Sequence, residues 1–517
     1  MESDNSIFYC MNEAVAFKMP HAPRRLFATL LVYCQPTTNV RKLWDNYFES
    51  IAEDYRRNGQ TSNDSILFST LTSINCFLES MGKSIKQYEL PALPTDAANK
   101  VRAREIEDEM SIQTPFEDHM LESKLNPEQQ VAFSKILQKI NSKESGMFFV
   151  DGPGGTGKTF IYRALLAHLR GRKMIALATA TSGVAAALLA GGRTAHSRFK
   201  IPINANEASF CNVTVQSGTA KLLHKADLII WDEAPMAKRC AIETLNRTMQ
   251  DIMETNLDFG GKVVVFGGDS RQVLPVVSKA TKEETIEASL VKSELWKKME
   301  ILMLTRNMRA EGDPYFSDFL LQVGNGDEHT SKDDMTRIPD QLLLKYDKED
   351  IPEQCLINKI FPCLQENAHS IQYIAERAIL AAKNDTVDML SKKLIDQFPG
   401  TKHTFLSFDA AEDDTNNYYQ EEFLNSLNPN GLPPHKLELK ENAPIMLLRN
   451  LDPLNGLCNG TRVVCRHFQG NVIHAEITVG QYKGVHILLP YIPLSPVENG
   501  GYPFKFKRKQ NPIWLCF

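Results

Sequence analysis

Residues 146–159 of this 517-residue chain read GMFFVDGPGGTGKT, and this stretch decides the fold. The apolar run 147–150 predicts a buried strand. The segment 160–169 has helical spacing, with Ile161, Leu165 and Leu169 on one face. Between them, residues 152–159 fit the pattern of a glycine, four variable residues and then Gly-Lys-Thr. A strand, this loop and a helix in that order predict an α/β domain that binds a nucleoside triphosphate.

Each fixed position of this P-loop has a chemical task. Without a Cβ, glycines let backbone N–H groups turn toward phosphates, and the helix N-terminus adds partial positive charge. Lys158 is expected to reach the β- and γ-phosphates, and Thr159 to bind Mg²⁺. The alternative is a glycine turn before an ordinary helix. The predicted nucleotide contacts within the loop are Gly152, Gly154, Gly155, Thr156, Gly157, Lys158 and Thr159.

An acid pair is the second predicted part of the site. The apolar strand 228–231 runs directly into Asp232 and Glu233. A carboxylate at a strand end can bind Mg²⁺, so Asp232 is the predicted metal ligand, and Glu233 is the predicted base for the attacking water. The alternative is a solvated turn after a strand.

Two glutamines are candidate nucleotide contacts. Gln272 lies in GGDSRQVLPV, after the strand 263–266, where it could sense the γ-phosphate, although Asp269 and Arg271 beside it could form a loop ion pair. Gln129 follows Asn126 by three residues, which is close to a capping box. Gln129 is therefore expected to close the helix N-terminus, to read an adenine edge, or to do both.

The segments ATATSGVAA and GGRTAHSRF are candidates for DNA contact. Short hydroxyl side chains among glycines and alanines can donate to phosphate oxygens, and histidine or phenylalanine rings can stack on bases. The alternative is that the small residues serve close packing and that Phe199 lies in the core. The predicted DNA contacts are Thr181, Ser182, Thr194, His196, Ser197 and Phe199.

Read in order, these blocks resemble the petite-integration-frequency family of superfamily one DNA helicases, in the form carried by Helitron transposons and expanded in plants. The resemblance extends over most of the chain from about residue 115. It is carried by LNPEQQVAF, GPGGTGKT, ATSGVAAALLAGGRTAHSRFKIP, ADLIIWDEAPM, GGDSRQVLPV, LTRNMR, ERAIL and APIMLLRNLDPLNGLCNGTRVV.

The resemblance implies an ATP-dependent motor that moves 5′ to 3′ on single-stranded or forked DNA as a monomer, with Mg²⁺ as cofactor. It also implies a role in DNA repair, recombination or telomere maintenance. The implied adenine reader is Gln129, and the implied γ-phosphate sensor is Gln272. Arg309, in LTRNMR, is implied as an arginine finger from the second motor lobe.

The sequence departs from the family pattern at two places. Ser270 stands where the family has an aromatic residue. The last two motor motifs of the family, a Lys-Ser-Gln-Gly type block and an Ala-Leu-Ser-Arg block, are absent before Phe517. We therefore expect a truncated chain with an incomplete second lobe. The alternative function is an uncoupled transposon remnant that binds ATP and DNA without unwinding. A small-molecule kinase is disfavoured because no motif for an acceptor pocket or lid accompanies the P-loop.

Composition predicts a soluble intracellular enzyme. The expected location is the nucleus, with mitochondria as the alternative. The 10 cysteines are scattered without a CxxC pair, which disfavours disulfides and structural zinc. The formal net charge of −5 disfavours a protein that coats nucleic acid, but it permits a local DNA groove. No signal peptide or membrane span is visible. The basic run 505–509 is expected to be a solvated strand face, with a nuclear signal as the alternative.

Four regions are predicted along the chain. Residues 1–115 form a helical N-terminal region that ends in a loose acidic junction at 105–109, and residues 116–300 form a RecA-like P-loop lobe. Residues 301–442 form a partial second RecA-like lobe, with a strand at 376–380 and Asn384 capping the next helix. Residues 443–517 form a β-rich, barrel-like insert, since Asn-Gly pairs and single glycines punctuate its short strands.

Overall fold

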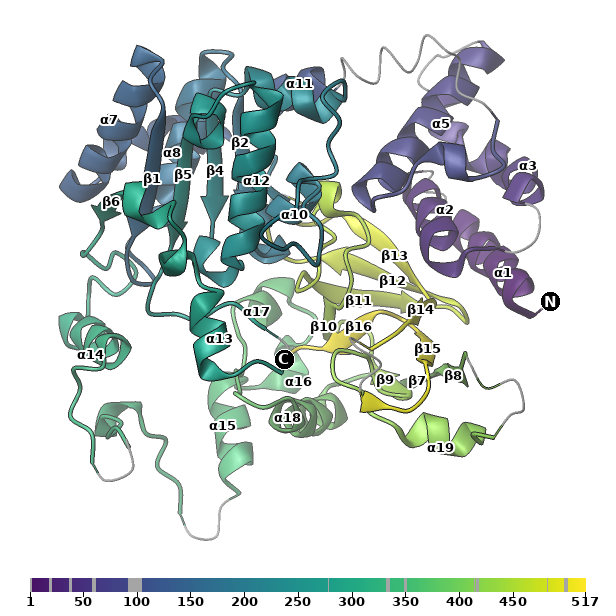
Figure 1. Cartoon of the computed structure of the whole chain (residues 1–517). Coiled ribbons are helices and arrows are strands. Elements are labelled where there is room, and N and C mark those ends of the chain that lie inside the picture. Colours follow the sequence, from purple (N-terminus) through teal and green to yellow (C-terminus); the bar gives the residue numbers. More distant parts are fainter. Residues whose placement is uncertain are drawn as a thin grey trace. The chain divides into compact units, whose positions relative to one another are not determined.

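A computed structural model of the whole chain (Figure 1) describes residues 2–17, 21–36, 40–57, 62–91, 105–277, 279–331, 335–347, 351–412, 414, 418–480, 482–496 and 501–517. The chain divides into two compact units. We call Pro94–Leu343 the P-loop unit, and Met1–Leu93 with Leu344–Phe517 the β-rich unit. The domain boundaries predicted from the sequence stay predictions.

The P-loop unit is built on a six-stranded parallel sheet in the order β3-β2-β4-β5-β1-β6. Its strands are β1 (Gly146–Asp151), β2 (Ala176–Ala180), β3 (Arg193–Thr194), β4 (Leu228–Asp232), β5 (Val263–Gly268) and β6 (Glu300–Met303). Its helices are α7 (Pro127–Ser142), α8 (Lys158–Gly171), α9 (Gly183–Ala187), α10 (Ala195–Phe199), α11 (Gly218–Lys225), α12 (Arg239–Ile252), α13 (Lys282–Glu287) and α14 (Pro314–Asn325).

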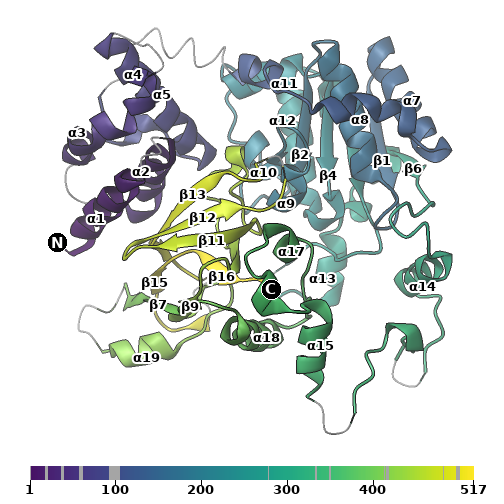
Figure 2. The same ribbon diagram turned by 180° about the vertical axis from the view of Figure 1, so that it is seen from behind.

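Helices cover both faces of this sheet, as parallel strands require. Alternate residues of β1 divide between two cores: Phe149 packs with α11 and α12, and Phe148 packs with α7 and α8. Figure 1 shows α12 on one face, and Figure 2, seen from behind, shows α8 on the other. The predicted apolar face of α8 is confirmed, because Ile161, Leu165 and Leu169 are all buried.

Strand β6 lies in this sheet and not in a second one. It pairs in parallel with β1, from Phe148 opposite Glu300 to Asp151 opposite Met303. The sequence analysis places this strand at the start of a second lobe. Its pairing with β1 instead makes it the edge strand of the P-loop sheet.

The acidic stretch at 105–109 is not the loose junction that the sequence predicts. Residues 105–110 are helical, and Glu109 is buried. Its carboxylate pairs with Arg198 and also with Arg170, at 3.2 Å. The junction sequence at 92–104 lies outside the described residues.

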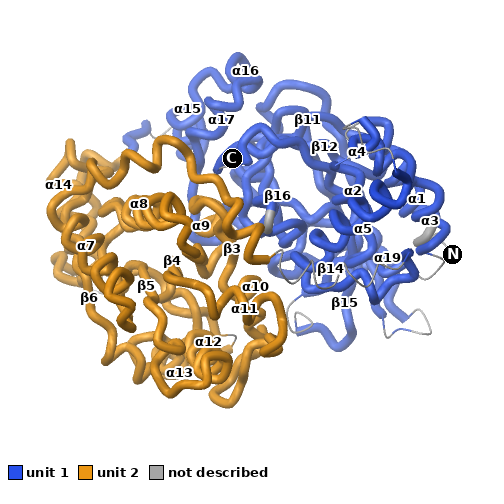
Figure 3. Tube along the Cα trace, turned by 90° about the horizontal axis from the view of Figure 1, so that it is seen from above, with its two compact units in different colours: residues 1–93, 344–517 blue, residues 94–343 orange. Residues whose placement is uncertain are grey.

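The β-rich unit is drawn in blue in Figure 3, and its described residues form three antiparallel sheets. The largest has five strands in the order β13-β12-β11-β10-β16, and the others are β14-β15-β8 and β7-β9. Its strands are β7 (His403–Leu406), β8 (Phe408–Ala411), β9 (Lys436–Leu439), β10 (Pro444–Leu447), β11 (Arg462–Phe468), β12 (Val472–Ile477), β13 (His486–Pro490), β14 (Ile492–Leu494), β15 (Phe506–Gln510) and β16 (Ile513–Leu515).

The helices of the β-rich unit come from both ends of the chain. They are α1 (Glu2–Ala16), α2 (His21–Cys34), α3 (Val40–Ile51), α4 (Glu53–Arg57), α5 (Asn63–Ser80), α15 (Pro352–Ile360), α16 (Leu364–Asn367), α17 (Ile371–Ala375), α18 (Asn384–Gln397) and α19 (Glu421–Ser426). The N-terminal helices share a core with Val472 of β12 and Leu488 of β13. No described helix is long and apolar enough to cross a membrane.

The predicted fold class is confirmed: an α/β protein with a parallel P-loop sheet, an antiparallel β-rich part and a helical N-terminal region. Two local expectations are wrong. Residues 377–381 do not form a strand, and Lys383 occupies the N-cap position of α18, one residue before Asn384.

The basic run 505–509 is not uniformly solvated. Strand β15 alternates its side chains, so that Phe506, Arg508 and Gln510 point inward. Arg508 and Asp409 form an ion pair at 2.6 Å in which both side chains are 0% exposed. Arg508 also donates to the carbonyls of Pro433 and Leu427, each at 3.0 Å. The solvated-face expectation is therefore wrong for Arg508.

Because this ion pair is buried, replacing its aspartate by the uncharged asparagine should strongly lower the free energy of unfolding. Asp409→Asn leaves the Arg508 charge buried without its counter-ion, which should cost about 3–5 kcal/mol of unfolding free energy. The matched control is Glu412→Gln, which removes the neighbouring exposed ion pair with Lys507 and should cost less than about 1 kcal/mol. Urea unfolding followed by circular dichroism measures both, and equal losses would contradict the role of burial.

Candidate active site

The three predicted parts of the site meet at one edge of the parallel sheet. β5 lies between β4 and β1 in the sheet. Since parallel strands end at the same edge, the P-loop after β1, the acid pair after β4 and Asp269 after β5 are neighbours. The expectation of a shared site for these segments therefore agrees with the fold.

Lys158 is held inside the P-loop. It is buried at the start of α8, and its Nζ donates to the carbonyl oxygens of Gly152, at 2.6 Å, and Pro153, at 3.3 Å. Gly157, the N-cap of α8, has a φ of +86°, which glycine adopts without strain. The loop is thus wrapped around the ammonium group on which phosphate binding would depend.

Gly155 is a tightly constrained position of the loop. Its φ is +95°, and a Cβ built there would lie 2.4 Å from Asn307 Oδ1 and 2.9 Å from Arg309 Cβ. Around Gly154, by contrast, no atom lies within 4 Å of a built Cβ. Glycine is therefore required at 155 by the packing of the fold itself.

Gln129 closes the N-terminus of α7, as expected. Its Oε1 accepts from the Asn126 N–H at 3.0 Å, and its own N–H donates to Asn126 Oδ1 at 2.9 Å, which completes the capping box. Its Nε2 donates to the Thr156 carbonyl at 3.0 Å. The amide is buried and uses both ends to join α7 to the P-loop, so adenine recognition by Gln129 stays a proposal.

Asp232 is buried at the end of β4, and Glu233 beside it is half-buried. Burial first and the Glu233 carboxylate second raise the pKa of Asp232 to about 6. Burial also raises the pKa of Glu233, while the Lys158 ammonium opposes that rise. Glu233 has a φ of +52°, and its N–H donates to Asp232 Oδ1 at 2.9 Å. Two carboxylates with little solvent beside one lysine form a site suited to a cation.

The loop after β5 is tied to the residue that precedes the P-loop. Gln272 Nε2 lies 3.5 Å from Asp269 Oδ2, and Arg271 lies 3.4 Å from Asp269 and 3.9 Å from Asp151. Ser270, at the family's aromatic position, donates its hydroxyl to Asp151 at 3.4 Å. Asp151 is a site residue that the sequence motifs did not indicate, although it directly precedes Gly152.

Arg309 belongs to the P-loop unit. The segment 304–310 follows β6 and runs beside the P-loop. The Leu304 N–H donates to the backbone carbonyl of Asp151 at 2.8 Å, and the Met308 N–H donates to the backbone carbonyl of Gly155 at 2.9 Å. Asn307, which the sequence analysis missed, donates its amide to the Gly154 carbonyl at 3.3 Å. The expectation that Arg309 comes from a second lobe is therefore wrong, because the pairing of β6 with β1 brings this segment alongside the phosphate loop.

The DNA candidates differ in accessibility. Thr181, Ser182, His196 and Ser197 are partly exposed, and burial lowers the pKa of His196. Thr194 is buried. Phe199 is 0% exposed and packs near the Trp231 ring, with ring centroids 6.0 Å apart. Base stacking by Phe199 is therefore wrong for this fold, and the core alternative holds.

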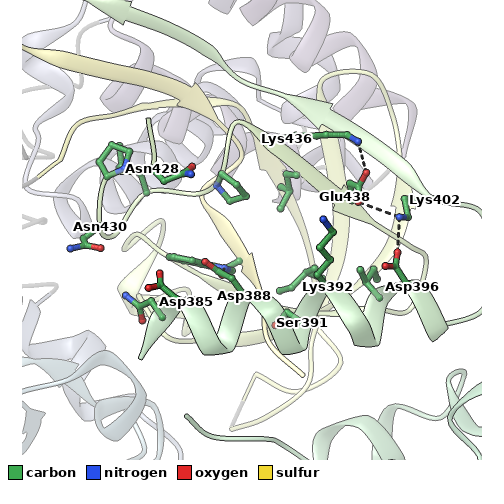
Figure 4. A pocket seen from close by; sticks show the side chains of 18 residues that line it. Asp385, Asp388, Ser391, Lys392, Asp396, Lys402, Asn428, Asn430, Lys436 and Glu438 are labelled. Carbon is green, nitrogen blue, oxygen red and sulfur yellow. Dashed lines mark hydrogen bonds and ion pairs between the residues drawn. The ribbon is translucent and has the colours of Figure 1, made fainter. Parts of the chain in front are cut away.

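A separate pocket of about 590 Å³ lies in the β-rich unit between α18, β9 and the loop 428–434 (Figure 4). Lys402 pairs with Asp396 at 2.8 Å and with Glu438 at 3.2 Å, and Lys436 pairs with Glu438 at 2.6 Å. The charges of the pocket thus compensate one another. Its lining includes none of the predicted site residues, so it is not part of the candidate active site.

Comparison with known families gives two matches along the chain. The family model "PIF1-like helicase" matches residues 124–334, which include every part of the candidate active site. The model "DNA helicase Pif1, 2B domain" matches residues 422–468. Residues 124–334 are therefore similar to the PIF1-like helicase family, and residues 422–468 to its 2B domain.

Curated relatives agree with this family. The chain is 29% identical over 368 residues to the ATP-dependent DNA helicase PIF1 of Saccharomyces cerevisiae, covering 67% of this chain and 38% of the relative. It is 25% identical over 383 residues to the human ATP-dependent DNA helicase PIF1, covering 70% of this chain and 52% of the relative. The chain is thus a homologue of ATP-dependent DNA helicases, and it spans only part of their length.

Solved structures of the family share the fold. A structure described as the basis for DNA unwinding at forked dsDNA by two coordinating Pif1 helicases matches with a TM-score of 0.52 and 21% identity, covering 76% of this chain and 81% of that one. A Bacteroides Pif1 helicase in complex with ADP-AlF3 and ssDNA matches with a TM-score of 0.50 and 20% identity, covering 74% and 81%. At these identities the likeness concerns the fold alone.

The constraint at Gly155 yields a prediction that needs no ligand. Gly155→Ala introduces a clash with Asn307 at a left-handed φ, and it should lower the melting temperature and loosen the segment 304–310. Gly154→Ala is the control and should leave the melting temperature unchanged. Differential scanning fluorimetry with limited proteolysis tests this, and a Gly155→Ala protein as stable as the control would contradict the packing argument.

Proposed function

We propose that this chain is an ATP-driven DNA motor that couples ATP hydrolysis in the candidate active site to 5′ to 3′ movement on single-stranded DNA and to unwinding of forked duplexes. One observation carries the proposal. The P-loop, the acid pair and the Gln272 loop follow adjacent strands of one parallel sheet, within the region matched by the PIF1-like helicase family. The named activities of the relatives are consistent with it.

Phosphate binding is assigned to the P-loop. The Lys158 ammonium now donates to two carbonyl oxygens, which are weaker partners than phosphate oxygens. Lys158 can therefore exchange these bonds for the β- and γ-phosphates, while backbone N–H groups of the loop and the N-terminus of α8 bind the same oxygens. The Gln129 amide uses one lone pair and one N–H within the fold, so its proposed contact with adenine falls to its second N–H or second lone pair.

Thr159 and Asp232 are the proposed Mg²⁺ ligands. A buried carboxylate and a hydroxyl fit a hard cation that completes its shell with water and phosphate oxygens. Among the described residues no group of three or more His, Cys, Asp or Glu side chains could hold a metal ion. Bound Mg²⁺ supplies positive charge to the phosphates that react.

Glu233 is the proposed general base. Burial raises the pKa of Glu233, which strengthens it as a proton acceptor for the attacking water. Gln272 and the exposed Arg309 are proposed to contact the γ-phosphate from the loops after β5 and β6. Both loops lie in the P-loop unit, so these contacts need no second lobe.

Thr181, one of the DNA candidates, forms two hydrogen bonds with the end of β4. The Thr181 N–H donates to the Asp232 carbonyl at 3.0 Å, and Thr181 Oγ1 accepts from the Trp231 indole N–H at 3.0 Å. A shift of β4 during hydrolysis would therefore move Thr181 and the adjoining Ser182. We propose that this connection transmits the nucleotide state to the DNA strand, with Thr194, His196 and Ser197 as further contacts.

The cellular role that we propose is DNA repair, recombination or telomere maintenance, carried out by a monomer in the nucleus or in mitochondria. This part rests on the resemblance to the family alone. It does not depend on the geometry described above.

The motor proposal predicts ATP-dependent strand displacement. The purified chain should release a fluorescent strand from a duplex with a 5′ single-stranded tail, and Lys158→Ala should abolish ATP binding and strand release because phosphate binding loses its cation. Lys221→Ala, a change at an exposed lysine of α11, is the control and should behave as the wild type. ATP binding and DNA binding without strand release would instead identify an uncoupled binding protein.

Glu233→Gln should separate nucleotide binding from hydrolysis. The amide keeps the shape of the side chain but cannot accept the proton, so kcat for ATP should fall by about 10²- to 10⁴-fold while ATP affinity changes little. DNA-stimulated ATPase assays and equilibrium binding of a fluorescent ATP analogue measure the two effects. A hydrolysis rate within twofold of the wild type would remove Glu233 from the role of base.

A further inference from the structure

Tyr162 is a buried polar residue that the proposed mechanism leaves unused. It lies on α8, four residues after Lys158, and its side chain is 0% exposed. Among the described residues its hydroxyl has no hydrogen-bond partner. A buried hydroxyl without a partner costs free energy, so such a group is rare without a function.

The position of this hydroxyl is fixed by Gly267. A Cβ built on Gly267 would lie 1.6 Å from the Tyr162 hydroxyl oxygen. The hydroxyl therefore occupies the space that a side chain at position 267 would fill. Any other residue at 267 would exclude it.

The register of the sheet places Asp232 beside this position. Trp231 of β4 is paired with Phe266 of β5. The next residues on these two strands, Asp232 and Gly267, therefore lie opposite each other. Side chains alternate along a strand, and Ile230 and Val265 share one core with Tyr162. Two residues further on, Asp232 and Gly267 face the same side of the sheet. The Tyr162 hydroxyl is therefore directed at the strand position next to the Asp232 carboxylate.

The electrostatic surroundings agree with this placement. Burial raises the pKa of Tyr162 well above its usual value, and Asp232 and then Glu233 raise it further. The oxygens of an ionised carboxylate can only accept, so the hydroxyl is the donor in any hydrogen bond between the two groups. One oxygen of Asp232 already accepts from the Glu233 N–H at 2.9 Å, so a second donor would fix the orientation of the whole carboxylate.

We propose that Tyr162 is a positioning residue for Asp232, whose hydroxyl donates to the carboxylate in the nucleotide-bound protein and holds it in the orientation that binds Mg²⁺. The inference rests on the proposed function, since it concerns the metal site of that reaction. Hydrogen bonds to a ligating carboxylate orient it, and their loss typically costs about 10- to 100-fold in metal affinity.

Tyr162→Phe is the test, because it removes one oxygen atom and keeps the ring. Binding of a fluorescent ADP analogue is measured while Mg²⁺ is titrated. In Tyr162→Phe the Mg²⁺ concentration at half-saturation should rise about tenfold. Melting temperature without nucleotide should stay equal or rise, since a buried hydroxyl without a partner is removed. A structural role alone would instead lower the melting temperature and leave the Mg²⁺ titration unchanged.

A double-mutant cycle assigns the effect to Asp232. In an Asp232→Asn background, adding Tyr162→Phe should change the Mg²⁺ titration by less than about twofold, because the carboxylate is already lost. An undiminished effect in that background, or an unchanged titration in Tyr162→Phe alone, overturns the inference while the proposed function stands. A wild-type protein that binds no nucleotide at any Mg²⁺ concentration overturns both.

Discussion

Three neighbouring parallel strands, β4, β5 and β1, are the constraint on which the candidate active site depends. Their shared direction brings the P-loop, the acid pair and Asp269 to one edge of the sheet. The same arrangement buries Asp232, and burial together with the Glu233 carboxylate raises the pKa of Asp232 to about 6, while the Lys158 ammonium opposes this rise. Burial makes the carboxylates costly without a cation and effective with one. The free-energy cost of burying the carboxylate and its ability to bind a cation therefore have the same origin.

Features set by contiguous residues were predictable from the sequence. The P-loop and its flanking strand and helix lie within the continuous stretch 146–169. The capping box lies within the four residues from Asn126 to Gln129. Both predictions agree with the structure. The second bond of Gln129, to Thr156, joins residues 27 apart in the chain, and nothing in the local pattern indicates it. The sequence therefore predicts that Gln129 caps α7, but not that its amide is hydrogen-bonded to the P-loop.

Features set by distant pairing were not predictable. Phe199 lies among small and hydroxylic residues that suit DNA contact, and only its packing beside Trp231 shows that it belongs to the core. The basic run at 505–509 indicates a solvated face, yet strand alternation turns Arg508 inward, where Asp409 lies 99 residues earlier in the chain. Glu109 is similar, because its partners Arg170 and Arg198 lie on α8 and α10. In each case the partner that buries the side chain is remote in sequence, so the local pattern does not indicate it.

The position of Arg309 follows from the register of one edge strand. β6 pairs with β1 so that Met303 lies opposite Asp151, the last residue before the P-loop. The chain that leaves β6 must therefore run beside the chain that leaves β1, and the bond from the Met308 N–H to Gly155 shows that it does so. A shift of one residue in this register would reverse every side chain of β6 and detach the segment from Gly155. The left-handed glycine at 155 leaves the room that this close approach requires. The placement of Arg309 therefore depends on the pairing of β6 with β1 and on the conformation of the loop at Gly155. The spacing of LTRNMR alone does not indicate either of them.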